Sequence, residues 1–170
     1  IMSKCVKGSV MKNVIIYAPR HVVPMSITLM KDLCWVATSY AAEQNKFDGD
    51  FSGNVRMVSA DGGDVLGFSG NTISMDTALD DIELPDTILL GAFWGQIDDI
   101  LDQNSALIPF LEQANKHNIP IAAVSNAPFF LAEAGLLNNK VATVYPPMTD
   151  LFQHRYPEVD LRSERAITDA

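Results

Sequence analysis

The chain has few of the features that mark secreted, metal-binding or membrane proteins. Only two of its 170 residues are cysteines, Cys5 and Cys34, too few for a disulfide scaffold and without the spacing of a zinc site. No apolar run is long enough to span a bilayer, and the N-terminal residues lack the hydrophobic region of a signal peptide. The sequence therefore predicts a cytoplasmic protein that makes no membrane contact and binds no metal or cofactor.

Positive charge is also scarce. The chain has 12 lysines and arginines against 21 acidic residues, which gives a net charge of −9. Such a chain repels phosphate backbones, so it is not expected to bind DNA or RNA itself. The acidic stretch from Asp76 to Glu83 is interpreted as a solvated turn, because nothing there fixes the geometry of a cation site.

Apolar residues make up 48% of the chain, enough for the core of one domain. Residues 1–12, which lack periodicity, predict a flexible leader before a domain at 13–170. Strand and helix patterns then alternate, which predicts an α/β fold with a mostly parallel sheet sandwiched by helices. The predicted strands are 13–18, 55–60, 86–90, 121–124, 141–145 and about 159–161, with a short partner of the second strand at 64–66 and another short strand at 72–75. The predicted helices are 25–44, one capped by Asn104 or Ser105, one after residue 125, and a short one ending near His154.

Residues 121–137, IAAVSNAPFFLAEAGLL, are the most informative stretch. The small and β-branched residues at 121–124 predict a strand buried on both faces of a parallel sheet. A helix follows at once: Ser125 or Asn126 can cap it, Pro128 fits its first turn, and Gly135 is placed to end it. Ser125 is therefore expected at a strand-to-helix turn, near N–H groups that can stabilise an anion.

This turn has two interpretations. A nucleophile elbow needs small residues two positions before and after the nucleophile, and Ala123 and Ala127 meet that requirement. A buried strand-to-helix turn without chemistry is common in doubly wound domains. The local pattern by itself favours the second interpretation.

Six stretches carry a family resemblance: VRMVSADGG (55–63), FSG (68–70), DTILLGA (86–92), LAEAGLL (131–137), VATVYP (141–146) and RYPEV (155–159). In this order and at about these spacings they resemble the class I glutamine amidotransferase-like superfamily, in its PfpI-like branch. The most similar group is the N-terminal sensor domain of AraC/XylS-type transcription regulators. The resemblance covers nearly everything from residue 13 onward and implies a flavodoxin-like fold.

Three positions depart from the catalytic members of this superfamily. Those members have a cysteine at the elbow, an acid after the first strand and commonly a histidine after the elbow helix; the alignment places Ser125, Met25 and Tyr145 there. A serine needs a base within hydrogen-bond reach, and neither methionine nor tyrosine can serve at neutral pH. His21, which follows the first strand, is the one histidine expected at the same edge of the sheet.

The resemblance and these departures together predict a non-catalytic ligand-sensing and dimerisation domain of an AraC-family regulator. Its partners would be a second copy, an unknown small-molecule effector, and DNA contacted only through a C-terminal helix-turn-helix domain that this sequence lacks. The sequence also ends before the last strand and helix expected of the sensor fold. The pocket would lie at the carboxyl edge of the sheet. Its candidate residues are Met25, Ala92, Phe93, Ser125, Asn126 and Tyr145.

Two other functions stay open. The first is a stand-alone PfpI-like amidohydrolase with Ser125 as nucleophile and an oxyanion hole formed by Ala92 or Phe93 and the Asn126 amide. The second is a structural or chaperone-like dimer that binds no ligand. Phe93 and Trp94 could accordingly line a pocket, a lid or a dimer interface.

Overall fold

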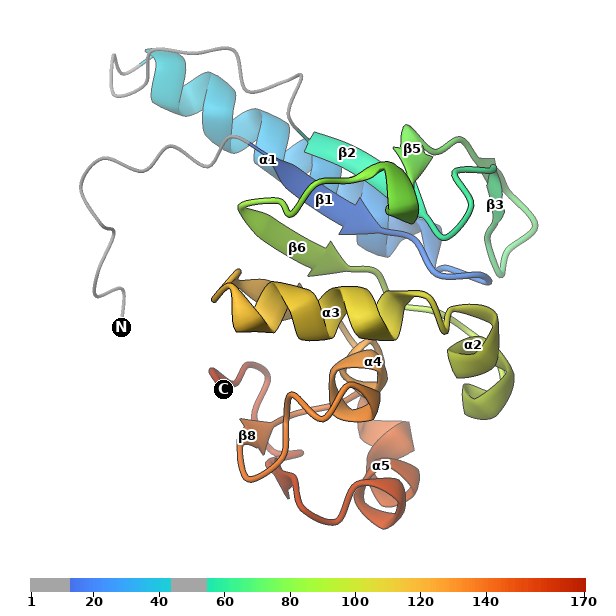
Figure 1. Cartoon of the computed structure of the whole chain (residues 1–170), viewed down its shortest axis with the longest axis vertical. Coiled ribbons are helices and arrows are strands. Elements are labelled where there is room, and N and C mark those ends of the chain that lie inside the picture. Colours follow the sequence, from blue (N-terminus) through green and yellow to red (C-terminus); the bar gives the residue numbers. More distant parts are fainter. Residues whose placement is uncertain (1–12, 44–54) are drawn as a thin grey trace.

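The computed structural model describes residues 13–43 and 55–170, so the predicted leader at 1–12 lies outside the described residues. Their centre is a five-stranded sheet (Figure 1). Its order is β5 (Thr77–Ala78), β2 (Val55–Ser59), β1 (Val14–Tyr17), β6 (Thr87–Leu90) and β7 (Ile121–Ala123). Every pairing in this sheet is parallel, which confirms the predicted α/β fold.

The central strand β1 explains why the sheet is covered on both sides. All four of its residues are buried, as expected for a β-branched run inside a parallel sheet. Successive side chains point to opposite faces, so Ile15 and Tyr17 join one core cluster while Val14 and Ile16 join another. The two clusters define the two helical layers.

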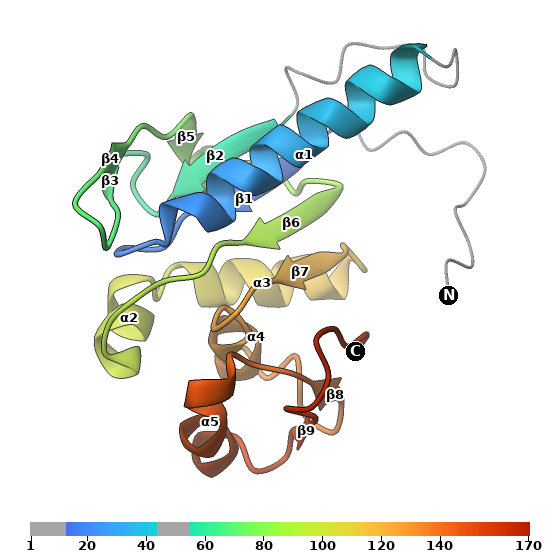
Figure 2. The same ribbon diagram turned by 180° about the vertical axis from the view of Figure 1, so that it is seen from behind.

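Helices cover these two faces. Helix α1 (Pro24–Glu43) packs on one face through Ile27, and Figure 2 shows it in front of the sheet, running along the direction of the strands. On the other face lie α2 (Ile97–Gln103), α3 (Leu107–Lys116) and α4 (Pro128–Glu133), whose apolar residues enter the larger cluster. No helix in the described part of the chain has the length and apolarity needed to cross a membrane.

Two smaller sheets flank the main one. β3 (Val65–Leu66) pairs with β4 (Thr72–Ile73) in an antiparallel hairpin, so the expected pairing of 64–66 with the second strand is wrong. A short η2 turn (Leu79–Asp81) follows β5. Near the C-terminus, β8 (Val141–Ala142) pairs with β9 (Asp160–Leu161), while η3 (Pro146–Met148) and α5 (Thr149–Arg155) lie between them.

Other local predictions also need correction. β7 is not buried on both faces: Ala122 is exposed, because β7 is an end strand paired only with β6 in the described sheet. The acidic stretch contains β5, which extends the sheet beside β2. Helix α2 was not predicted, and Asn104 ends it instead of capping the next helix.

Candidate functional site

Ser125 occupies the predicted turn between β7 and α4. Its φ is +61°, a left-handed conformation that is uncommon for side chains other than glycine and stores strain. The turn is held from outside, because the Tyr145 N–H donates to the Ser125 carbonyl at 2.9 Å. Ser125 is exposed. The strand, sharp turn and helix of an elbow are therefore present, with Tyr145 beside them.

Asn126 clamps a neighbouring loop. Its side chain does not cap α4, since the N-cap is Ala127 without a side-chain bond. Asn126 is only 4% exposed, and its Oδ1 accepts the Phe93 N–H at 3.1 Å while its Nδ2 donates to the Phe93 carbonyl at 2.8 Å. The side-chain amide thus pairs with Phe93 as a peptide group of an adjacent strand would.

The opposite side of the same loop is also bonded. Val22 and Phe93 form an isolated antiparallel bridge. The Val23 N–H donates to the Ala92 carbonyl at 2.8 Å, and the Trp94 N–H donates to the His21 carbonyl at 2.9 Å. Residues 91–95 are therefore held between the loop after β1 and the elbow.

The two aromatic residues of this loop have different surroundings. The Phe93 ring is 1% exposed and packs on Phe130, with ring centroids 5.2 Å apart, so it belongs to the core. Trp94 is exposed and lies against Phe68, with centroids 5.9 Å apart. Trp94, rather than Phe93, presents aromatic surface to solvent.

Met25 and Ala92 lie where α1 begins. Met25 is 70% exposed, while the Ala92 N–H donates to the Ser26 hydroxyl at 3.0 Å. Ser26 in turn donates to the Val23 carbonyl at 2.7 Å. Hydrogen bonds thus link Ser125 to Tyr145 and Asn126 to Phe93, and Ala92 is tied to α1 through Ser26. Ligand contact by the six candidate residues stays a prediction.

Several polar groups near Ser125 already have partners within the protein. Two of the three candidate oxyanion donors, the N–H groups of Ala92 and Phe93, already bond to Ser26 and Asn126. The His117 ring contacts the Gln113 carbonyl on α3, and His21 lies beside a separate cavity. Within 13–43 and 55–170, no hydrogen bond joins the Ser125 hydroxyl to an acid or a histidine.

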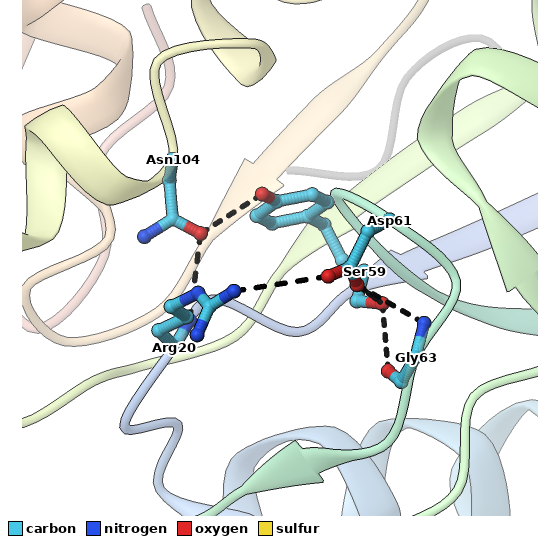
Figure 3. A network of polar contacts seen from close by, with 6 residues as sticks. Arg20, Ser59, Asp61, Gly63 and Asn104 are labelled. Atoms are coloured by element: carbon cyan, nitrogen blue, oxygen red, sulfur yellow. Dashed lines mark hydrogen bonds and ion pairs between the residues drawn. The ribbon is translucent and has the colours of Figure 1, made fainter.

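A cavity of about 180 Å³ lies at the carboxyl ends of β1 and β2. Figure 3 shows the polar contacts among residues at this cavity. We call it the Arg20 cavity; its polar lining includes Arg20, His21, Ser59, Asp61, Asp64 and Asn104. None of the six predicted pocket residues lines it. His21, which the sequence predicts at this edge of the sheet, lines this cavity.

Asp61 is fixed on one side of this cavity. Its Oδ1 accepts the Gly63 N–H at 3.0 Å and lies 3.4 Å from the Ser59 hydroxyl, which donates to the Gly63 carbonyl at 2.9 Å. The Gly63 N–H is the main reason why the pKa of Asp61 lies below its usual value. Asp61 is therefore ionised at neutral pH, with its Oδ2 3.7 Å from Arg20 Nη2.

Asn104 forms the floor of the cavity. It is 1% exposed, and its Oδ1 accepts from the Tyr17 hydroxyl at 2.9 Å and from the Arg20 N–H at 3.4 Å. Its Nδ2 donates to the Ile100 carbonyl at 2.7 Å. Burial raises the pKa of Tyr17, so its hydroxyl remains a donor at neutral pH.

Two further features lie away from these sites. A cavity of about 680 Å³ runs along β7 and is lined by Ala122, Leu131 and the segment 166–170 among others. On the α2 side of the molecule, Arg155 bonds to Asp98, to Glu133 at 3.4 Å and to the Tyr156 hydroxyl at 3.0 Å. These contacts of Arg155 join α2, α4 and α5.

Comparison with known proteins decides the family. The sequence profile of the DJ-1/PfpI family matches residues 36–169. The chain belongs to the DJ-1/PfpI family. The predicted amidotransferase-like membership is thereby confirmed.

Relatives of this DJ-1/PfpI domain include transcription regulators. It is 28% identical over 120 residues to the HTH-type transcriptional regulator CdhR of Pseudomonas aeruginosa, covering 71% of this chain and 34% of CdhR. The chain spans less than half the length of the curated relatives it matches.

Solved structures share the fold. A putative transcriptional regulator from Vibrio parahaemolyticus gives a TM-score of 0.75 at 20% identity, over 93% of this chain and 80% of that one. An AraC family transcriptional regulator from Pseudomonas putida gives 0.67 at 17% identity, over 89% and 76%.

The Arg20 cavity was not predicted from the sequence, although its residues follow a recognisable pattern. Arg20 and His21 follow β1, and Asp61 and Asp64 follow β2. Because β1 and β2 are parallel neighbours, their carboxyl ends meet at one edge of the sheet. Asn104 could not have been placed in this way, since it reaches the cavity from the end of α2.

Proposed function

We propose that this DJ-1/PfpI domain is the non-catalytic ligand-sensing and dimerisation domain of an AraC-family transcription regulator. The main support is the geometry of the elbow. Ser125 has the backbone conformation of a nucleophile, but the nearby N–H groups of Ala92 and Phe93 bond to protein side chains instead of being open to a substrate. The similarity to CdhR supports the regulatory role. DNA would be contacted by a C-terminal domain outside this chain, and we expect the regulator in the cytoplasm.

Helix α1 supports dimerisation. Its buried side carries Ile27, and its outer side carries several exposed apolar residues. Apolar residues on two sides of a helix are typical of one that packs between two layers. The outer residues are spaced three or four apart and are 51% to 70% exposed: Met25, Leu29, Leu33, Val36 and Tyr40. They form a stripe roughly 22 Å long at 1.5 Å per residue.

A second copy is the proposed partner of this α1 stripe. Two such stripes packed against each other give a self-complementary interface, the kind that a twofold dimer requires. An effector could act on DNA binding through this dimer if it binds one arrangement of the two subunits more tightly than another. The difference between its two affinities then shifts the equilibrium between these arrangements.

The dimer is tested by light scattering coupled to size-exclusion chromatography. We expect the chain to elute as a dimer and the Leu29→Glu/Leu33→Glu variant as a folded monomer, because charges are costly at a buried apolar interface. Leu151→Glu, which changes an exposed leucine on α5, is the matched control and should remain dimeric. A monomeric wild type, or a double variant that stays dimeric, would contradict the proposed interface.

The absence of catalysis is tested with a fluorophosphonate probe. We expect no labelling of Ser125, because a serine without a base is a weak nucleophile. Labelling that disappears in Ser125→Ala would instead support the amidohydrolase.

A further inference from the structure

The Arg20 cavity presents opposite charges at its mouth. Arg20 Nη2 and Asp61 Oδ2 are 3.7 Å apart, and their side chains are 62% and 68% exposed. Asp64 adds a second carboxylate to the lining. An exposed ion pair at this distance contributes little to stability, so both charges can exchange partners with a small molecule.

We propose that the Arg20 cavity binds a small α-amino acid or a similar zwitterion, with its carboxylate on Arg20 and its ammonium group on Asp61 and Asp64. In an α-amino acid both charged groups are attached to one carbon atom. Such a ligand can therefore lie antiparallel to a guanidinium and a carboxylate that are themselves only 3.7 Å apart. Each of its charges then meets a charge-assisted hydrogen-bond partner.

The lining disfavours ligands of a single charge. An anion on Arg20 would face Asp61 and Asp64, and a cation on Asp61 would face the guanidinium. A metal ion fits poorly, because the described residues contain no group of three or more metal-ligating side chains. A zwitterion alone satisfies both signs.

The size of the cavity limits the side chain of the ligand. Its volume of about 180 Å³ is below the range of roughly 300–1,000 Å³ that is common for ligand pockets. Glycine, alanine and serine fit this limit. Val65 supplies an apolar wall to the same space, next to the buried Ser59 and Asn104.

The Asp61 carboxylate of this site is oriented before a ligand arrives. Asp61 is oriented by Gly63 and Ser59, and the Arg20 backbone is bonded to Asn104. Preorganised charges lose less free energy to ordering when a ligand binds. None of the six candidate residues of the elbow pocket lines this cavity, so its ligand can be tested separately from that pocket.

Isothermal titration calorimetry on this chain tests the proposal. Glycine, L-alanine and L-serine are titrated alongside acetate and methylammonium, which carry one charge each. We expect saturable one-to-one binding of at least one amino acid, with acetate and methylammonium at least about tenfold weaker. Because no DNA or dimer measurement is involved, failure here leaves the proposed regulator role to its own tests.

Two variants and a matched control locate the binding. Arg20→Gln and Asp64→Asn should each weaken binding by about tenfold or more, while circular dichroism confirms that they fold. Arg162→Gln removes another exposed arginine, which pairs with Asp160 at 2.9 Å near β9, and should bind like the wild type. The proposal is overturned if none of the three amino acids binds, if acetate or methylammonium binds as tightly, or if both folded variants keep wild-type affinity.

Discussion

Replacing Asn126 with alanine should loosen the loop that connects β6 to α2. The change leaves the N–H and the carbonyl of Phe93 without their side-chain partner. Phe93 is 1% and Asn126 4% exposed, so water cannot replace these bonds without local opening. A buried backbone group left unpaired costs about 1–3 kcal/mol, and the two groups together should lower the free energy of unfolding by about 3 kcal/mol.

Urea unfolding followed by circular dichroism measures this loss. At about 2–4 °C per kcal/mol for a chain of this size, the melting temperature should fall by about 6–12 °C. Asn115→Ala is the matched control: it changes an exposed asparagine of α3 and should stay within about 0.5 kcal/mol of the wild type. If Asn126→Ala lost less than about 1 kcal/mol, the two bonds to Phe93 would not be holding the loop.

Three further predictions concern other contacts. Gly91→Ala should lower the free energy of unfolding by about 1–3 kcal/mol, because the added Cβ would lie 2.4 Å from the Ile27 side chain; an unchanged melting temperature would argue against this close packing. Arg155→Met should cost about 1–2 kcal/mol at low salt and less in 1 M salt, since it removes partly exposed contacts to two carboxylates; a cost independent of salt in urea unfolding would contradict it. Burial raises the pKa of Tyr17 above its ordinary value of about 10. The protonated Tyr17 hydroxyl therefore stabilises the folded state fully below about pH 10, and this stabilisation is lost as the pH rises further. Melting temperatures between about pH 8 and 11 should therefore decline less steeply for Tyr17→Phe than for the wild type or for Tyr40→Phe, and parallel curves would refute this cause.

Elements with a clear local pattern were the predictable part of the fold. β1 is a continuous apolar run, β6 has three apolar residues after Thr87, and α1 spans 20 residues, so these patterns can be recognised in the sequence. α2 begins after Gln96, which makes no side-chain cap bond, so it lacks a start signal such as the Pro128 of the six-residue α4. β5 has only two residues, and its membership of the sheet depends on β2, which the local sequence does not encode.

The elbow was predictable in backbone but not in side-chain partners. The sequence placed Ser125 between β7 and α4, and the structure confirms this. It also suggested that Ser125 or Asn126 caps α4, whereas Asn126 bonds to Phe93, 33 positions earlier in the chain. An asparagine can cap a helix or bond to a distant loop with the same side-chain amide, so only the three-dimensional structure distinguishes the two roles.

The turn that carries part of the family resemblance also shapes the proposed amino-acid site. Gly62 has a φ of +75°, and a Cβ there would lie 2.8 Å from the Ala78 backbone nitrogen, so the turn can pass β5 only with glycine. The next residue, Gly63, then orients Asp61 toward Arg20. A change at Gly62 would consequently alter folding and binding together. Asp64 lines the same cavity from an exposed position, which makes it the residue where loss of binding can be separated from loss of structure.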